Sequence, residues 1–405
     1  MMNCLAIGRT SRKNLLLVSS TVMILLYFYI CPDTIRQTQL NSEETLIRVN
    51  TSQSNRISSE IHLAFVVDHG AFLTQFNTLI KNILYYQGRY HTNRTECELN
   101  IQTIRNGQCP KRAQSQPVTP IHLRLLVSDR ARNATTAYFN EWNLPHIRAT
   151  FYNWSLAASE TRRIRTRYTL NDVGIMKILW PEILGSEVQR IIILDTDLMF
   201  NRNIQELWNM FDLFNDEQTI GGIFEQLDNL QNNMATAQFP ILKTGINSGV
   251  LLLQLDRMRQ LNWAQLWRSV GERMQNDEGG VNFGEQGIIN TILYRKPNLL
   301  FELPCEWNYI AAGTHIPGYC PFTWVVGIPD RENCLPTRGS EEQELHLAAI
   351  THLCALPQPE EIIEKDYSGN PRPVTELTAF TVDDVRNTFM EVYYSFRNMD
   401  KRCFF

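Results

Sequence analysis

Basic residues are not in excess in this sequence. Its 405 residues include 38 Lys and Arg against 42 Asp and Glu, for a formal net charge of −4. Binding to nucleic acid needs a face rich in positive charge, so we expect no nucleic-acid partner. The chain also lacks a repeat with a period of about 20–50 residues, which excludes solenoids and propellers, and it lacks the CxxC and HExxH patterns typical of zinc sites. A hydrophobic content of 43% still allows a packed core, which excludes a mostly disordered chain.

Acidic residues are also missing from the first 32 residues. Three cations, Arg9, Arg12 and Lys13, precede an uncharged and mostly apolar run over residues 15–31. As a helix this run would rise about 25 Å, which is near the lower limit for crossing a bilayer. A cleaved signal peptide is the alternative, but no small-x-small cleavage pattern follows the run. Because positive charge holds the N-terminal flank in the cytoplasm, we expect a single-pass type II protein of the Golgi membrane.

Composition divides the chain into four segments. We expect a cytoplasmic tail (1–14), a signal-anchor transmembrane helix (15–31), a polar stem (32–60) and a luminal domain (61–405). Four N-x-S/T sequons agree with a luminal location without establishing it.

The cysteines beyond the apolar run should pair in part, because the lumen is oxidising. Cys97 and Cys109 bracket a polar loop and could clip it, and Cys305 could pair with Cys320 or Cys334. Sequence alone does not fix such connectivity.

The luminal segment alternates between two kinds of pattern. Short apolar runs rich in β-branched residues predict strands at 61–68, 121–128, 146–152 and 189–194. Helical spacing of apolar residues marks the segments at 72–86 and 173–184. This alternation predicts an α/β fold with a Rossmann-like, mostly parallel sheet covered by helices on both faces. Such sheets bind ligands outside the carboxyl ends of their strands.

Asp195 and Asp197 stand directly after the fourth of these strands. An isolated D-x-D is most often a polar strand end or helix cap. At this edge, however, two carboxylates on one side of an extended backbone repel each other unless a cation lies between them. A metal held in this way in a luminal protein suggests nucleotide-sugar chemistry.

Four further motifs follow along the chain. Gly245 and Gly249 allow a close approach of the backbone to a ligand, and Asn247 between them offers both a donor and an acceptor. The others are GEQG at 284–287 before a helix, LPCEWNY at 303–309, and a strand that ends at His352. Taken singly, each is as well explained by a turn, a cap or a structural histidine.

Together, in this order, the motifs resemble glycosyltransferase family 8. The sequence is especially similar to the N-terminal xylosyltransferase domain of the LARGE-type xylosyl- and glucuronyltransferases, and also to the glucoside xylosyltransferases. The residues that carry the likeness are FYN at 151–153, IMKIL at 175–179, RIIILDTDLMFNRNIQELW at 190–208, GINSGVLLLQLDRMR at 245–259 and LPCEWN at 303–308. The resemblance implies the glycogenin-like GT-A fold and a retaining transferase.

The resemblance also implies roles at matching positions. Mn²⁺ would be bound by Asp195, Asp197 and His352, and would hold the diphosphate of a UDP-sugar. Glu285 and Gln286 would line the reacting face of the sugar as catalytic residues.

The remaining implied contacts are with the donor. The end of the first strand would lie against uridine, and other residues would contact the phosphate or the sugar; this donor-binding set is Val66, Val67, Asp68, Lys177, Asp195, Asn247 and Gly249. Front-face substitution and double displacement both remain open as routes to retention.

The sequence departs from the family at three places. Glu285 stands where the family usually has Asp. Gly287 stands where many members have the second Asp of DQD, which resembles the glycogenin version. After His352 the family's Lys is absent, and the next Lys is Lys365. His346 therefore remains a second candidate ligand.

The leading hypothesis is transfer of xylose from UDP-xylose to a glycan or glycoprotein acceptor, with a glucuronic acid-ended chain implied by the resemblance. The alternatives are another UDP-sugar or a glucose acceptor, or a catalytically inactive carbohydrate-binding relative.

Overall fold

The structure, a computed structural model, describes residues 45–47, 60–91, 97, 118–166, 171–227, 240–311, 320, 322–323, 346–354, 358–366 and 382–405. The predicted tail and signal anchor and most of the stem lie outside these residues, as do Cys109 and Cys334. Within the described ranges, no helix has the length and apolar character that crossing a membrane requires.

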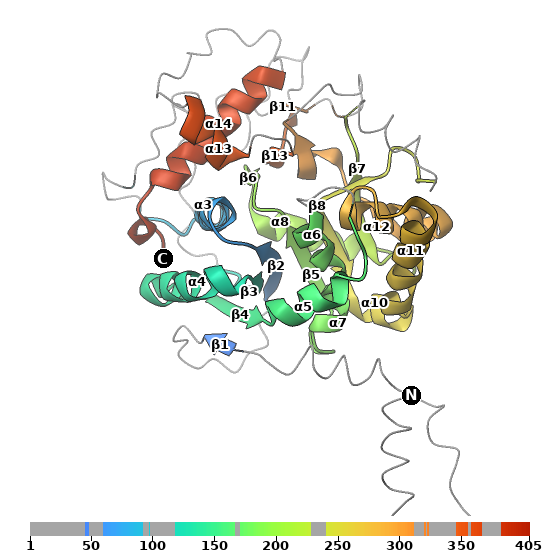
Figure 1. Ribbon diagram of the computed structural model, residues 1–405. Coiled ribbons are helices and arrows are strands. Elements are labelled where there is room, and N and C mark those ends of the chain that lie inside the picture. Colours follow the sequence, from blue (N-terminus) through green and yellow to red (C-terminus); the bar gives the residue numbers. More distant parts are fainter. Residues whose placement is uncertain are drawn as a thin grey trace, which may run out of the picture.

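An eight-stranded sheet runs through the middle of the molecule in the order β1-β4-β3-β2-β5-β8-β7-β9 (Figure 1). The central strands β4, β3, β2 and β5 are parallel, as predicted, whereas β8 is antiparallel to both of its neighbours. The strands are β1 (Thr45–Ile47), β2 (Ile61–Val67), β3 (Ile121–Val127), β4 (Ile147–Tyr152), β5 (Arg190–Leu194), β7 (Ile220–Phe224), β8 (Ile246–Gln254) and β9 (Leu300–Glu302).

The other described strands form two smaller sheets. One has the order β10-β13-β6, and the other pairs β11 with β12. Their bounds are β6 (Leu198–Phe200), β10 (Tyr309–Ile310), β11 (Phe322–Thr323), β12 (His346–Leu347) and β13 (Ile350–His352).

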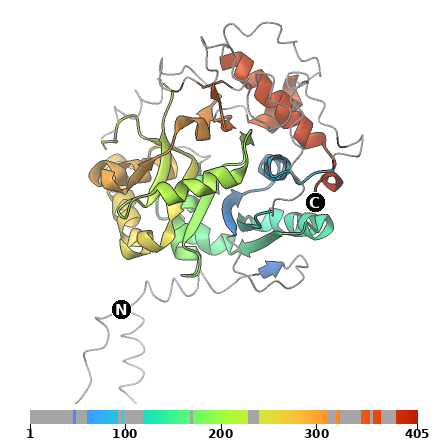
Figure 2. The ribbon, with the colours of Figure 1, turned by 180° about the vertical axis from the view of Figure 1, so that it is seen from behind.

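Helices cover both faces of the large sheet, as the sequence predicts. Along β2, Leu63 and Phe65 point into one hydrophobic core, while Ala64 points into the other. The first core contains residues of α3 (Ala71–Tyr86), α4 (Asp129–Trp142), α8 (Ile204–Asn209) and α14 (Val382–Asn398). The second contains residues of α5 (Trp154–Thr161), α7 (Trp180–Ile183), α10 (Leu255–Gln260), α11 (Trp263–Glu278) and α12 (Gly284–Arg295). Figures 1 and 2 show these two groups on opposite sides of the strands.

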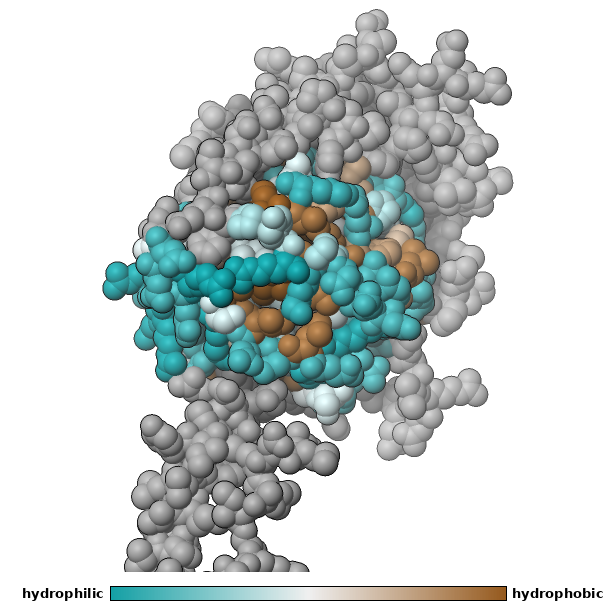
Figure 3. Space-filling model, turned by 90° about the vertical axis from the view of Figure 1, so that its right-hand side faces the viewer, coloured by the Kyte–Doolittle hydropathy of each residue, from teal (hydrophilic) through white to brown (hydrophobic). Residues whose placement is uncertain are grey.

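The outer surface on the side of α10, α11 and α12 is mostly hydrophilic, with a small group of hydrophobic residues among the polar ones (Figure 3). Since Trp263 and Trp267 of α11 are buried in the second core, this helix is amphipathic with its apolar side inward.

The predicted helix at 173–184 is broken into three pieces. These are α6 (Asn171–Gly174), the 3-10 helix η3 (Ile175–Leu179) and α7, whose first turn contains Pro181. Because proline has no N–H to donate to the preceding turn, it fits the start of a helix and not its interior. The break places Lys177 on the short 3-10 turn.

The C-terminal helix α14 packs against α3. The buried Lys81 ammonium of α3 donates hydrogen bonds to three carbonyls at the end of α14, those of Phe396, Arg397 and Met399, at 2.7–2.9 Å. Cations stabilise the negative end of a helix dipole in this way. This arrangement fixes α14 and the chain end beside α3.

Two disulfides are present among the described residues. Cys97 bonds to Cys403, so the predicted clip to Cys109 is wrong. The partners are 306 residues apart, a pairing that only the docking of the C-terminus beside α3 brings about. Cys305 bonds to Cys320, which confirms one of the two predicted alternatives.

Candidate functional site

Asp195, Asp197 and His352 converge at the carboxyl edge of the parallel strands. Their ligand atoms all lie within 4.8 Å of one another. The Nε2 atom of His352 is 3.3 Å from Oδ1 of Asp197 and 3.8 Å from Oδ2 of Asp195. Strand pairing explains the convergence, because β6 begins directly after Asp197 and the antiparallel partner β13 places His352 opposite Leu198.

Lys177 links this group to the start of α12. Its ammonium lies 2.5 Å from Oδ1 of Asp195 and 3.0 Å from Oε1 of Glu285. Glu285 also accepts a 2.8 Å hydrogen bond from the Ser248 hydroxyl, and the side-chain oxygen of Gln286 accepts one from the Ser248 backbone N–H at 3.1 Å. The predicted residues of η3, α12 and the strand edge therefore form one connected site.

The charges within the site shift one another's pKa values. Burial raises the pKa of Asp195 despite the nearby Lys177. Burial acts in the same direction on Asp197, but the adjacent His352 and a hydrogen bond from Gln358 outweigh it and lower its pKa. Burial would lower the pKa of Lys177, yet Asp195 and Glu285 raise it above its ordinary value. Lys177 is therefore a fixed positive charge at neutral pH.

His352 responds to the same carboxylates. Burial alone would lower its pKa, and the charge of Asp197 together with their hydrogen bond raises it instead. A divalent cation in this place would take over the role of that proton, since imidazole binds a metal only in its neutral form.

Two glycines leave room for site residues. A Cβ atom on Gly249 would lie 2.2 Å from Cε1 of His352, and one on Gly174 would lie 2.7 Å from Oε2 of Glu285. Real Cβ contacts are never this short, so a larger residue at either place would displace the neighbouring side chain. Gly249 thus accommodates the candidate ligand His352.

Asn247 is buried, and its side chain forms hydrogen bonds within the protein. Its Oδ1 accepts hydrogen bonds from Gly249 N and Asn308 Nδ2, both at 2.9 Å, and its Nδ2 donates to Oε2 of Glu225 at 3.1 Å. Sequence reasoning did not single out Glu225. The available signal was the same as for Asp195, namely an acidic residue directly after a buried strand, here β7.

Gln358 is another residue that the sequence did not reveal. Its side-chain amide donates to Oδ2 of Asp197 at 3.3 Å and accepts from Gln75 of α3 at 3.1 Å. Gln75 in turn accepts a hydrogen bond from the Thr196 hydroxyl at 3.0 Å. The two amides thus hold Thr196 and Asp197 in place. Gln75 belongs to α3, and Gln358 directly precedes α13 (Pro359–Asp366).

The predicted uridine contacts lie at the end of β2. Strand β2 is the parallel neighbour of β5, so Val66, Val67 and Asp68 share the edge at which Asp195 lies. Val67 is fully buried in the core, and Asp68 pairs with His69 at 2.8 Å. His346, the alternative metal ligand, begins β12, but its side chain is outside the described part of the chain.

A family model named Glycosyl transferase family 8 matches residues 133–323. The matched residues make up just under half of the chain. The predicted resemblance to this family is thereby confirmed. The matched segment includes Lys177, Asp195, Asp197, Asn247 and Glu285, whereas His352 and the end of β2 lie outside it.

LARGE-type proteins are among the curated relatives. The chain is 36% identical over 193 residues to the human xylosyl- and glucuronyltransferase LARGE2, covering 47% of this chain and 26% of that protein. The chicken xylosyl- and glucuronyltransferase LARGE1 is 34% identical over 193 residues, covering 47% of this chain and 25% of that protein. The match thus spans about a quarter of the length of these relatives. Among solved structures, mouse xyloside xylosyltransferase 1 in its apo form has 18% sequence identity and a TM-score of 0.45, covering 72% of this chain and 97% of that one.

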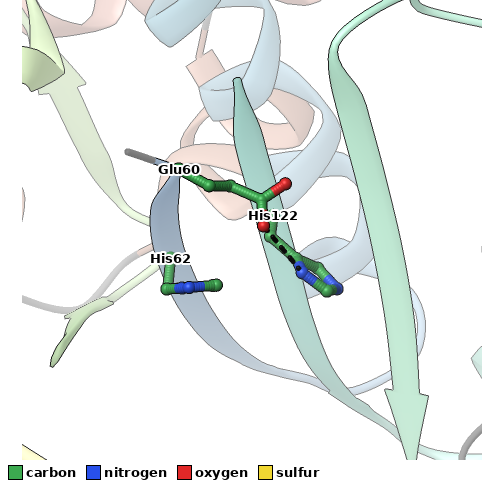
Figure 4. A group of neighbouring side chains, drawn as sticks. All are labelled: Glu60, His62 and His122. Carbon is green, nitrogen blue, oxygen red and sulfur yellow. Dashed lines mark ion pairs between the residues drawn. The ribbon is translucent and has the colours of Figure 1, made fainter. Parts of the chain in front are cut away.

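A second cluster lies at the opposite ends of the strands, outside the residues that the family model matches. Glu60, His62 and His122 point toward one another (Figure 4), and His122 Nδ1 is 3.4 Å from Oε2 of Glu60. The Arg148 guanidinium, however, already contacts both carboxylate oxygens of Glu60, and the charge of Arg124 is near enough to lower the pKa of His62. The single carboxylate is already paired with Arg148, and Arg124 adds positive charge near His62, so the cluster has no net negative charge to attract a cation. We therefore assign no metal to it.

Proposed function

We propose that the chain is a Mn²⁺-dependent retaining glycosyltransferase that transfers xylose from UDP-xylose to a glycan or glycoprotein acceptor, with a glucuronic acid-ended chain as the favoured acceptor. The observation that carries the proposal is the convergence of Asp195, Asp197 and His352 within 4.8 Å at the ligand edge of the sheet, inside or beside a family 8 domain.

The donor set of this group fits Mn²⁺. Two carboxylates and one imidazole combine the oxygen ligands that suit Mn²⁺ with a nitrogen ligand that Mg²⁺ accepts poorly. When bound, the ion would neutralise the diphosphate and stabilise it as the leaving group. Lys177 holds a permanent positive charge beside Asp195 and is placed to add to that stabilisation. Glu285, fixed by Lys177 and Ser248, would line the reacting face of the sugar together with Gln286.

Charge favours xylose as the donor sugar over glucuronic acid. Glu225 is buried beside Asn247, and a sugar carboxylate brought there would meet like charge. Xylose carries neither a carboxylate nor a hydroxymethyl group at C5. The LARGE-type relatives are named for both xylosyl and glucuronyl transfer, and we propose only xylosyl transfer for this chain.

Location in the secretory pathway is part of the same proposal. The two disulfides, Cys97–Cys403 and Cys305–Cys320, are stable in an oxidising compartment. We propose a Golgi type II protein, anchored in the membrane through residues 15–31, with the family 8 domain in the lumen.

The test is a donor screen. The full chain is incubated with Mn²⁺ and UDP-xylose, UDP-glucose, UDP-galactose or UDP-glucuronic acid, with and without glucuronic acid-ended oligosaccharides, and UDP release and product mass are measured. We expect release with UDP-xylose and an acceptor that gains one pentose with retained configuration. Turnover with another donor and not with UDP-xylose would show that the proposed donor sugar is wrong. An absence of UDP release with every donor would refute the proposal that the chain is an enzyme.

One observation favours a second candidate, a catalytically inactive carbohydrate-binding relative. Among the described residues after His352, the side chain that hydrogen-bonds the Asp197 carboxylate is the neutral Gln358, which brings no positive charge to a leaving group. A chain of this kind would bind UDP in the presence of Mn²⁺, as calorimetry would show, without releasing UDP from any donor.

A further inference from the structure

A continuous line of hydrogen bonds joins the buried Glu225 to His352. From Oε2 of Glu225 it passes to Nδ2 of Asn247 at 3.1 Å, from Oδ1 of Asn247 to Nδ2 of Asn308 at 2.9 Å, and from Oδ1 of Asn308 to Nδ1 of His352 at 3.0 Å. The four residues come from the end of β7, from β8, from the 3-10 helix η6 (Cys305–Asn308) and from β13. Each is at most 2% exposed, so water cannot replace a missing partner.

The direction of the line is fixed at Glu225. This carboxylate accepts from three donors, the backbone N–H groups of Gln226 and Leu227 on Oε1 and the amide of Asn247 on Oε2. A carboxylate offers only acceptors, so Asn247 must present its NH₂ group to it. Its oxygen then faces Gly249 N and the NH₂ group of Asn308.

The same logic continues to the imidazole. Because Asn308 uses its NH₂ group toward Asn247, it turns its oxygen toward Nδ1 of His352. An oxygen there accepts a proton from Nδ1, which leaves the lone pair of the neutral ring on Nε2. Nε2 is the atom that lies 3.3 Å from Asp197 and 3.8 Å from Asp195.

We propose that Glu225 is a positioning residue for the metal site, which acts through Asn247 and Asn308 to keep the His352 proton on Nδ1 and Nε2 available to the metal. The proposal rests on the metal role of His352 in the proposed function. Groups beyond the direct ligands commonly set the tautomer of a metal-binding histidine, and their loss costs about 10–100-fold in metal affinity.

The test compares Glu225→Gln with the full wild-type chain. The glutamine amide has one acceptor oxygen for three surrounding donors, so when that oxygen faces the two backbone N–H groups its NH₂ group faces the NH₂ group of Asn247. Asn247 then either loses this hydrogen bond or turns over and brings its NH₂ group against the N–H of Gly249, and its position is disturbed in both cases. Glu182→Gln is the matched control, because Glu182 is also a buried carboxylate but lies on α7 in contact with Trp267 and Arg268. Mn²⁺ affinity is measured by the loss of the free-ion EPR signal, and nitrogen ligation by the ¹⁴N coupling of bound Mn²⁺ in pulsed EPR.

We expect Glu225→Gln to bind Mn²⁺ about 10–100-fold more weakly and to lose the ¹⁴N coupling, while Glu182→Gln keeps both. If Glu225→Gln does not fold, Asn308→Ala interrupts the line beside His352 and should give the same two losses. Wild-type coupling that persists unchanged in the Glu225 and Asn308 variants would overturn this inference alone. The absence of any ¹⁴N coupling in the wild-type protein would overturn it together with the metal role of His352.

Discussion

The Lys177 ammonium lies between two carboxylates that the chain contributes from opposite sides of the site, 2.5 Å from Asp195 and 3.0 Å from Glu285. Asp195 belongs to the candidate metal group, and Glu285 lies in the first turn of α12 and is predicted to face the sugar. One buried cation thus joins the two carboxylates.

Replacing Lys177 with methionine should reduce turnover strongly. The substitution keeps the length of the side chain but removes the positive charge nearest to Asp195, and loss of one such electrostatic contact costs about 10²–10³ in kcat. The measurement is the rate of UDP release at saturating donor. The control is Lys243→Met, which removes a lysine that pairs with Glu302 at the surface and should leave the rate unchanged. Equal rates for both variants would contradict the role given to Lys177.

Gly249→Ala should weaken metal binding while leaving the fold intact. The added methyl group would stand 2.2 Å from Cε1 of His352, so the imidazole must move away from Asp197. We expect Mn²⁺ to bind about 10-fold more weakly or worse. Gly185→Ala is the comparison, because its Cβ would meet only the end of the exposed Glu187 side chain, which can move aside. If the two variants bind Mn²⁺ equally well, Gly249 does not control the place of His352.

Local patterns in the sequence were sufficient for much of this architecture. The β-branched run at Ile61–Val67 and the helical spacing over Ala71–Tyr86 depend only on neighbours in the chain, and both elements were predicted to within about two residues. The position of Asp195 and Asp197 at the ligand edge followed from the same patterns.

The features that escaped prediction depend on distant residues. Cys97 meets Cys403 only because α14 docks on α3. Glu225 is connected to His352 only because β7, β8 and β13 bring the hydrogen-bonded side chains together. The break at Pro181 was readable in principle, since proline disfavours a helix interior.

Removal of the metal should abolish transfer, and Mn²⁺ should restore it better than Mg²⁺. The imidazole of His352 is a ligand that Mn²⁺ accepts readily, whereas Mg²⁺ prefers oxygen alone. After dialysis against a chelator, UDP release is measured while each ion is titrated back. Asp197→Asn should not recover with either ion. Full activity after chelation would show that no metal ion takes part in the transfer.

The second cluster should make the fold sensitive to acid. Burial and the charge of Arg124 lower the pKa of His62 from 6.5 to about 3 in the folded chain. Between pH 6.5 and 3, His62 therefore binds a proton in the unfolded chain but not in the folded chain. The free energy of unfolding falls as the pH falls through this window. Glu60 adds to this loss below pH 4.5, because its pKa is lowered to about 2: burial would raise it, but hydrogen bonds from His122 and Arg148 outweigh that effect.

Replacing His62 with glutamine should remove part of that acid sensitivity. We expect the slope of stability against pH between about 6.5 and 3 to become shallower by up to about 1.4 kcal/mol per pH unit, as follows from the loss of one titrating proton. The measurement is denaturant unfolding at a series of pH values, with His69→Gln, which removes an imidazole from the surface, as the control. Parallel pH profiles for His62→Gln and the wild-type chain would show that His62 does not cause the acid sensitivity.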